Sequence, residues 1–152
     1  MRATPSPKNW RTMLLAFDGS ACAQAAFETA LRLAKAEEAR LVICTVVDPI
    51  QVAGEHAPAP PTQQALDEER AGVAQALDAA AERVRAAGVT VETVVAEGEP
   101  VYEIIECAKR RAADAIVIGT HGRSGLERLF LGSVAEGVLR GAHVPVVVVR
   151  HG

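Results

Sequence analysis

The sequence predicts an α/β fold, a single doubly wound sandwich in which a five-stranded parallel sheet of order 3-2-1-4-5 carries helices on both faces. Short aliphatic runs alternate along the chain with longer stretches of helical periodicity. The runs at residues 40–47, 115–119 and 145–150 are apolar almost throughout, which is typical of parallel strands covered on both faces. A length of 152 residues with 49% hydrophobic and 3% aromatic content fits one domain with an aliphatic core.

The first two elements are a buried strand and an amphipathic helix. The run Met-Leu-Leu-Ala-Phe at residues 13–17 ends in Asp-Gly-Ser, which predicts a strand followed by a turn. A helix is expected over residues 21–39, because apolar residues recur there at i, i+3, i+4 and i+7. These positions are Phe27, Ala30, Leu31 and Ala34.

The middle of the chain predicts a second strand, a long loop and a second helix. Residues 40–47 are apolar and rich in β-branched side chains, as expected of a strand. Residues 48–61 contain several prolines and predict a loop longer than most connections. A helix is expected over residues 63–87, because Val73, Leu77, Ala80 and Val84 make one apolar face and Gly88 is a suitable stop.

The last third predicts three more strands separated by two helices. Residues 89–96 form the third strand, and Pro100 suits the first position of the third helix. Residues 115–119 form the fourth strand, a short helix follows from about residue 131 to Gly141, and residues 145–150 form the fifth strand. Residues 1–10 are expected to be a flexible arm, and residues 11–152 the domain.

Composition excludes several classes of function. The net charge is −3 without a strongly basic block, so we expect no nucleic-acid partner. No apolar run approaches the roughly 20 residues of a membrane helix, and the N-terminus lacks the apolar centre of a secretory signal. Three scattered cysteines, Cys22, Cys44 and Cys107, are interpreted as buried thiols in a reducing compartment. We therefore expect a cytoplasmic protein without membrane association, disulfide framework or metal cluster.

A glycine-rich stretch follows the fourth strand and is the strongest indication of a site. It reads Gly-Thr-His-Gly-Arg-Ser-Gly-Leu-Glu-Arg-Leu-Phe-Leu-Gly-Ser from Gly119 to Ser133. Glycines allow sharp turns and close approach of a ligand, and a helix that opens at Gly132-Ser133 offers free N–H groups to an anion. In a sheet of order 3-2-1-4-5 this stretch would face the Asp-Gly-Ser turn across the switch point, where such folds bind ligands.

The pattern alone leaves two interpretations of this stretch open. In one, it binds phosphates, with Arg123 adding a charge-assisted contact. In the other, the glycines only form turns and Ser133 only caps a helix. The P-loop motif and the Gly-x-Gly-x-x-Gly motif after the first strand are both absent, which disfavours those two nucleotide-binding classes.

The chain resembles the ATP-binding branch of the universal stress protein family. The resemblance lies in Gly119-x2-Gly122 followed after nine residues by Gly132-Ser133, in Asp-Gly-Ser after the first strand, in Gly-Glu-Pro before Val101 and in Pro-Val-Val-Val-Val near the end. It extends from about residue 11 to residue 150. It implies bound ATP accompanied by Mg²⁺ or Mn²⁺, and a homodimer paired through the last strand.

The resemblance also assigns roles to individual residues. It implies that Asp18, with the backbone of Ala16 and Phe17, lies on the adenosine side, and that Val46 contacts adenine. Ile118 and Gly119 would lie along the ribose. The implied phosphate-binding residues are Gly122, Arg123, Gly132, Ser133 and Val134. Ala135 departs from members with a hydroxyl residue at that position, and this departure would remove one phosphate contact.

Three functions remain open at this stage. The preferred hypothesis is a regulatory protein in which bound ATP sets conformation or partner choice. The alternatives are a slow ATPase and an ATP-free interaction module. We expect no catalytic residue, because His121 has no carboxylate or second histidine near it in sequence and is interpreted as a loop residue. The alternative to a ligand-binding role for Asp18 is that it caps the first helix, a role that Ser20 would share.

Overall fold

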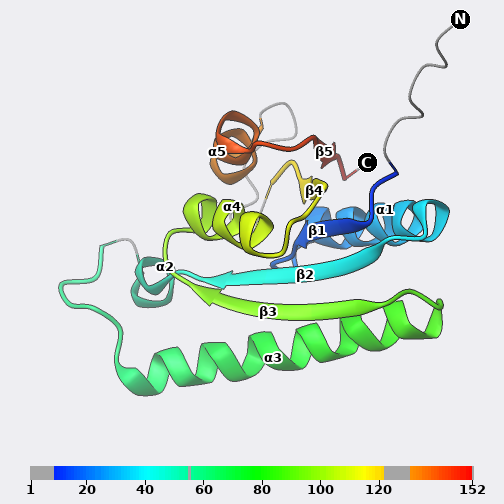
Figure 1. Ribbon diagram of the computed structural model, residues 1–152. Coiled ribbons are helices and arrows are strands. Elements are labelled where there is room, and N and C mark those ends of the chain that lie inside the picture. Colours follow the sequence, from blue (N-terminus) through cyan, green and yellow to red (C-terminus); the bar gives the residue numbers. More distant parts are fainter. Residues whose placement is uncertain (1–8, 55, 122–130, 152) are drawn as a thin grey trace, which may run out of the picture.

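The computed structural model describes residues 9–54, 56–121 and 131–151, and they form a parallel sheet between two layers of helices (Figure 1). The five strands are β1 (Thr12–Ala16), β2 (Arg40–Val47), β3 (Val91–Glu97), β4 (Ala115–Gly119) and β5 (Val146–Val149). Their order is β3-β2-β1-β4-β5, and every neighbouring pair is parallel. The predicted fold class and strand order are confirmed.

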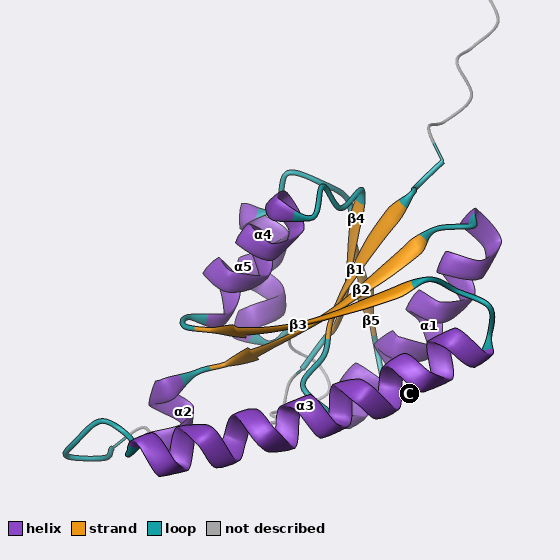
Figure 2. Cartoon of the chain, turned by 60° about the horizontal axis from the view of Figure 1, so that its bottom comes forward, coloured by secondary structure: helices purple, strands orange, loops and turns teal. Residues whose placement is uncertain are grey.

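Helices cover both faces of this sheet. They are α1 (Ala21–Glu37), α2 (Pro49–Ala53), α3 (Gln63–Ala86), α4 (Pro100–Arg110) and α5 (Ser133–Gly141). Figure 2 shows α1 and α3 on one side of the sheet and α4 and α5 on the other. No helix in the described part of the chain is long and apolar enough to cross a membrane.

Side chains alternate between the two faces of the sheet, and each face forms its own hydrophobic core. In β1, Met13 and Leu15 face α1 and α3, whereas Leu14 and Ala16 face α4 and α5. Successive side chains of a strand point to opposite faces, so a strand that is apolar at every position feeds both cores. Trp10, at the end of the expected N-terminal arm, packs against the first core.

The capping residues explain where the helices begin. The hydroxyl of Ser20 accepts from the N–H of Ala23 at the start of α1, and that of Thr62 accepts from Ala65 at the start of α3, each at 3.1 Å. Each hydroxyl satisfies one of the N–H groups that a first helical turn leaves unpaired. The start of α4 is capped by the carboxylate of Glu99, with Pro100 at the first position as predicted.

Several element boundaries differ from the sequence expectation, most of them by one or two residues. The predicted loop at residues 48–61 contains α2, which Asp48 caps and Pro49 opens; a five-residue helix is too short to show an apolar periodicity. The short helix α5 begins at Ser133 rather than near residue 131, because Gly132 is its N-cap. The strand expected from residue 89 begins at Val91.

Candidate functional site

A cavity of about 640 Å³ lies beyond the carboxyl ends of β1, β2 and β4. The strand order reverses between β1 and β4, so the cavity occupies the switch point at which open parallel sheets bind ligands. Its walls come from the ends of these strands, from α2 and α3, and from the first turn of α5. The structure thus brings the Asp-Gly-Ser turn and the two described ends of the glycine-rich stretch to one cavity.

All of the predicted site residues within the described part of the chain line this cavity. They are Ala16, Phe17, Asp18, Val46, Ile118, Gly119, Gly132, Ser133 and Val134. The remaining two predicted residues, Gly122 and Arg123, lie outside the described residues.

The Asp-Gly-Ser turn after β1 is held by its own side chains. The Oδ1 atom of Asp18 accepts a hydrogen bond from the N–H of Ser20 at 2.9 Å. Gly19 between them has a φ of 78°, a left-handed conformation that glycine adopts readily. Ser20, rather than Asp18, is the N-cap of α1. Asp18 therefore shapes the turn and borders the cavity at once.

The reason for glycine at position 119 differs from the one expected from the sequence. A Cβ atom there would lie 2.8 Å from the carbonyl carbon and oxygen of Cys22 in α1. Real Cβ atoms essentially never come so close to backbone atoms. Gly119 thus allows α1 to close against the end of β4, and that tight packing, rather than only ligand approach, requires the glycine.

Gly132 joins the start of α5 to the end of β4. Its N–H donates to the carbonyl oxygen of Thr120 at 2.7 Å. A Cβ atom on Gly132 would meet the same oxygen at 2.8 Å, although its φ of −63° suits any residue. The close contact, and not an unusual backbone angle, is what excludes a side chain here.

The hydroxyl of Ser133 is not needed to start the helix. Gly132 is the N-cap of α5, Ser133 takes the first helical position, and no described side chain caps this end. The interpretation in which Ser133 serves only as a cap is therefore excluded. The first turn of α5 instead directs its N–H groups and partial positive charge to an end that lines the cavity.

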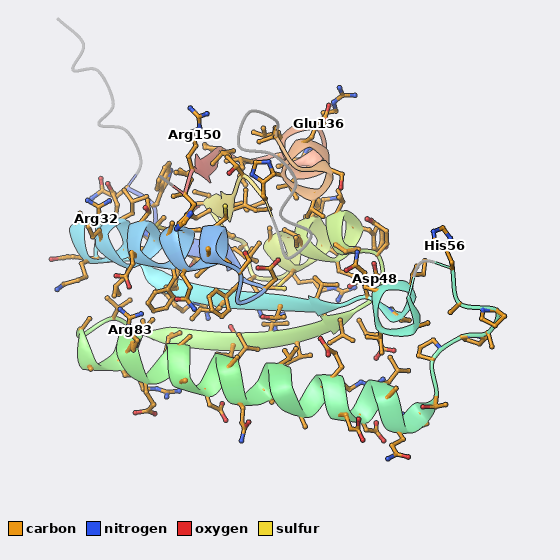
Figure 3. All side chains as sticks on the ribbon, turned by 180° about the vertical axis from the view of Figure 1, so that it is seen from behind. Arg32, Asp48, His56, Arg83, Glu136 and Arg150 are labelled. Atoms are coloured by element: carbon orange, nitrogen blue, oxygen red, sulfur yellow. The ribbon has the colours of Figure 1, made fainter. Side chains whose placement is uncertain are left out.

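The wall formed by α2 and α3 was not predicted. It consists of Asp48, Gln51 and Val52 from the start and middle of α2, and Glu69 and Val73 from α3. Figure 3 labels Asp48 where β2 passes into α2. Its Oδ1 atom accepts from the N–H of Ile50 at 3.0 Å and so fixes the first turn of α2. The only sequence signal was the Asp-Pro pair, which marks a helix start.

Two further polar residues were missed. The buried hydroxyl of Thr45 donates to the carbonyl oxygen of Phe17 at 2.6 Å and ties β2 to the end of β1. A threonine within the otherwise apolar run of residues 41–47 was the available signal. His121, interpreted as a loop residue, also lines the cavity, and its Nε2 atom is buried without a hydrogen-bond partner among the described residues.

The described residues that line the cavity include acidic side chains but no basic ones other than His121. Its carboxylates are Asp18, Asp48 and Glu69, and the described lining residues include no lysine or arginine. No group of three or more His, Cys, Asp and Glu side chains within the described ranges could hold a metal ion by itself. An anionic ligand would therefore have to rely on the first turn of α5 or on cations from beyond this set of residues.

The comparisons with known proteins agree with this architecture. Residues 9–150 match the model of the universal stress protein family. Universal stress protein MJ0531 from Methanocaldococcus jannaschii is 37% identical over 93% of this chain and 82% of its own length.

Solved structures of the same family superpose on the fold. Universal stress protein UspA from Lactobacillus plantarum is 27% identical, covers 95% of this chain and 100% of its own, and superposes with a TM-score of 0.82. A universal stress protein solved in complex with cAMP is also 27% identical over 95% of this chain and 100% of its own, with a TM-score of 0.72. The chain described here belongs to the universal stress protein family.

Proposed function

We propose that this protein is a nucleotide-dependent regulatory protein that binds ATP in the cavity at the switch point and acts as a homodimer. The observation that carries the proposal is the convergence of every described predicted residue on one cavity, beside the first turn of α5. A relative of the same fold, 27% identical, was solved with an adenine nucleotide, cAMP.

The two ends of the cavity suit the two ends of an adenine nucleotide. Apolar residues such as Phe17 and Val46 lie toward β1 and β2 and offer a surface for a base, with Asp18 as a polar acceptor beside them. The first turn of α5, with Gly132 and Ser133, offers N–H groups and a hydroxyl, which suit phosphate oxygens. A volume of about 640 Å³ lies within the usual range of small-molecule sites.

The acidic lining also bears on the ions that would accompany a nucleotide. Three carboxylates, Asp18, Asp48 and Glu69, line the described cavity. Mg²⁺ or Mn²⁺ bound to the phosphates would add positive charge beside them, and oxygen ligands suit such ions. Gly122 and Arg123 belong to the proposed phosphate site but lie outside the described residues.

The function proposed is binding rather than catalysis. Asp18 and Asp48 already accept hydrogen bonds from the backbone, and His121 has no carboxylate hydrogen-bonded to it among the described residues. Hydrolysis is expected to be far slower than the roughly 10 per second of a median enzyme. The enzyme hypothesis is preferred instead if phosphate release approaches that rate and is lost in His121→Ala.

A thermal-shift titration of nucleotide-free protein tests ATP binding. A ligand that binds only the folded state adds about 2.7 kcal/mol at a hundred times its dissociation constant. For a domain of this size that corresponds to roughly 2–4 °C per kcal/mol. GTP is the control and should raise the melting temperature less. Absence of any shift with millimolar ATP and Mg²⁺ would leave the ATP-free interaction module as the function.

The homodimer is proposed to form through β5, which lies at the opposite edge of the sheet from β3 (Figure 1). The side chains of these two edge strands differ. The edge strand β3 carries carboxylates held in salt bridges: Glu92 with Arg40 and Arg111, and Glu97 with Arg70. Charged side chains are a usual protection of an edge strand. In contrast, β5 consists of four half-buried valines. An edge strand without charged side chains can pair with the same strand of a second copy.

The oligomeric state tests this part of the proposal. Wild-type protein is expected to run as a dimer in light scattering at micromolar concentration, and Val147→Lys should give monomers or insoluble protein. Val95→Lys places the same charge at an exposed position of β3 and should leave the dimer intact. A wild-type monomer at that concentration would contradict pairing through β5.

A further inference from the structure

A buried threonine of β2 lies at the point where the pairing of β2 with β1 stops. Among the buried residues of the described part of the chain, Thr45 is the one that is polar or charged, with an exposed fraction of 5%. The register of β1 and β2 ends at the pair of Ala16 and Cys44, so Thr45 is the first residue of β2 beyond it. Thr45 also lines the cavity. A buried hydroxyl normally has a hydrogen-bond partner, and that partner indicates its role.

The partner of Thr45 is the backbone of Phe17, the first residue after β1. The Thr45 hydroxyl donates to the carbonyl oxygen of Phe17 at 2.6 Å. The N–H of Phe17 donates to the carbonyl oxygen of Cys44 at 2.9 Å. Two consecutive residues of β2 therefore hold both backbone groups of Phe17. Its ring is buried as well, with its centroid 6.2 Å from that of Phe27 in α1.

The hydrogen bond from Thr45 also fixes the peptide group that leads to Asp18. This peptide bond is trans and planar, so the carbonyl of Phe17 and the N–H of Asp18 point in opposite directions and turn together. On its other side, Asp18 is held by the N–H of Ser20, which donates to Oδ1 at 2.9 Å. Asp18 is thus anchored by β2 from one side and by its own turn from the other.

We propose that Thr45 is a positioning residue that sets the affinity of the cavity for the nucleoside part of its ligand. This role rests on the proposed function, in which Phe17 and Asp18 lie on the adenosine side of bound ATP. The hydroxyl acts through the backbone, which it holds in place before the ligand arrives, so that binding does not have to order residues 17 and 18. Without the hydroxyl, the carbonyl of Phe17 loses its partner and this segment becomes free to move.

Two substitutions of Thr45 separate its hydroxyl from its methyl group. Valine is similar in shape and has no hydroxyl, whereas serine keeps the hydroxyl and lacks the methyl group. We expect Thr45→Val to bind ATP about 5- to 10-fold more weakly, and adenosine more weakly by the same factor, because the loss lies on the nucleoside side. Thr45→Ser should bind both ligands as wild type does. Isothermal titration of nucleotide-free protein measures these affinities.

Amide hydrogen exchange in nucleotide-free protein measures the positioning without any ligand. The N–H groups of Phe17 and Ser20 both donate hydrogen bonds in this segment. They should exchange faster in Thr45→Val than in wild type, and at the wild-type rate in Thr45→Ser. Thr93→Val is the matched control, because it makes the same change in the neighbouring strand β3 at a residue that does not line the cavity. It should change neither the exchange nor the affinities.

These measurements distinguish a failure of the role of Thr45 from a failure of ATP binding. If wild type binds ATP and adenosine and Thr45→Val binds both as tightly, or shows unchanged exchange, Thr45 is not a positioning residue although ATP binding stands. A loss confined to ATP, or an equal loss in Thr45→Ser, also overturns the role. If wild type binds neither ligand, the proposed function fails and the role of Thr45 with it.

Circular dichroism shows which variants are folded before these measurements. If Thr45→Val does not fold, Thr45→Ala removes the same hydroxyl without adding a methyl group. Thr45→Ser must match wild type in both affinity and exchange whatever the other two variants do, so the role of the hydroxyl stays open to contradiction.

Discussion

The two walls of the cavity are built in different ways. The wall at the ends of β1 and β4 consists mainly of backbone and small residues, held by main-chain hydrogen bonds from Phe17 to Cys44 and from Gly132 to Thr120. The wall of α2 and α3 consists of longer side chains, among them Asp48, Gln51 and Glu69, on helices at the surface.

The two walls differ in how freely their residues can be substituted. At Gly119 and Gly132 an added Cβ would meet backbone atoms at 2.8 Å, so the first wall cannot change without moving α1 or α5. Side chains such as Gln51 and Glu69 can change without touching the sheet. We infer that the first wall sets the class of ligand and that the second adjusts its affinity.

The largest expected effect comes from breaking the first wall. In Gly132→Val the new side chain would meet the carbonyl oxygen of Thr120, so the start of α5 must move away from β4. Such overpacking costs about 1–3 kcal/mol of stability, and the stabilisation by ATP should be lost entirely. Denaturant unfolding and thermal shift measure the two effects.

A matched substitution provides the control for Gly132→Val. Gly72→Val makes the same change in α3, where an added Cβ meets no atom within 4 Å. Its response to ATP should equal that of wild type. If Gly132→Val keeps the full ATP shift, the first turn of α5 is not part of the ligand site.

A smaller effect is expected from Ser133→Ala. Ser133 is exposed and does not cap α5, so its loss should leave the fold unchanged. One hydrogen bond to a charged phosphate is worth about 1–2 kcal/mol, which is roughly a 5- to 30-fold weaker affinity for ATP. Isothermal titration with ATP and with adenosine checks this, and an equal loss for adenosine would place Ser133 away from the phosphates.

The sequence predicted the first wall much better than the second. The strand ends follow from the aliphatic runs, and the predicted strand order is the one that brings the two unusual loops to one crevice. The Asp-Gly-Ser and Gly-Ser segments mark turns by local chemistry. The positions of Gln51, Glu69 and Val73 depend on how α2 and α3 pack, which no local pattern reports. The contact of Gly119 with Cys22 likewise became visible only when α1 and β4 were placed together.

The smallest expected effect comes from the second wall, through the charge of Asp48. Asp48→Asn should keep α2 capped, because asparagine is as good an N-cap as aspartate. It removes one negative charge from a cavity whose described lining contains Asp18 and Glu69 as well. Charges several Å apart near a protein surface interact by roughly 0.5–1 kcal/mol, so ATP should bind about two- to fivefold more tightly. The gain should shrink as salt is added, and adenosine, which carries no charge, should bind as it does to wild type.

The control for Asp48→Asn is Asp78→Asn, the same change of charge in α3 at a residue that does not line the cavity. Titrations with ATP at low and high salt, with and without Mg²⁺, compare the two variants. If Asp48→Asn instead weakens binding only when Mg²⁺ is present, Asp48 supports the cation that accompanies the phosphates. The α2 wall would then be part of the fixed chemistry of the site, and the division between a fixed and an adjustable wall would be wrong at this residue.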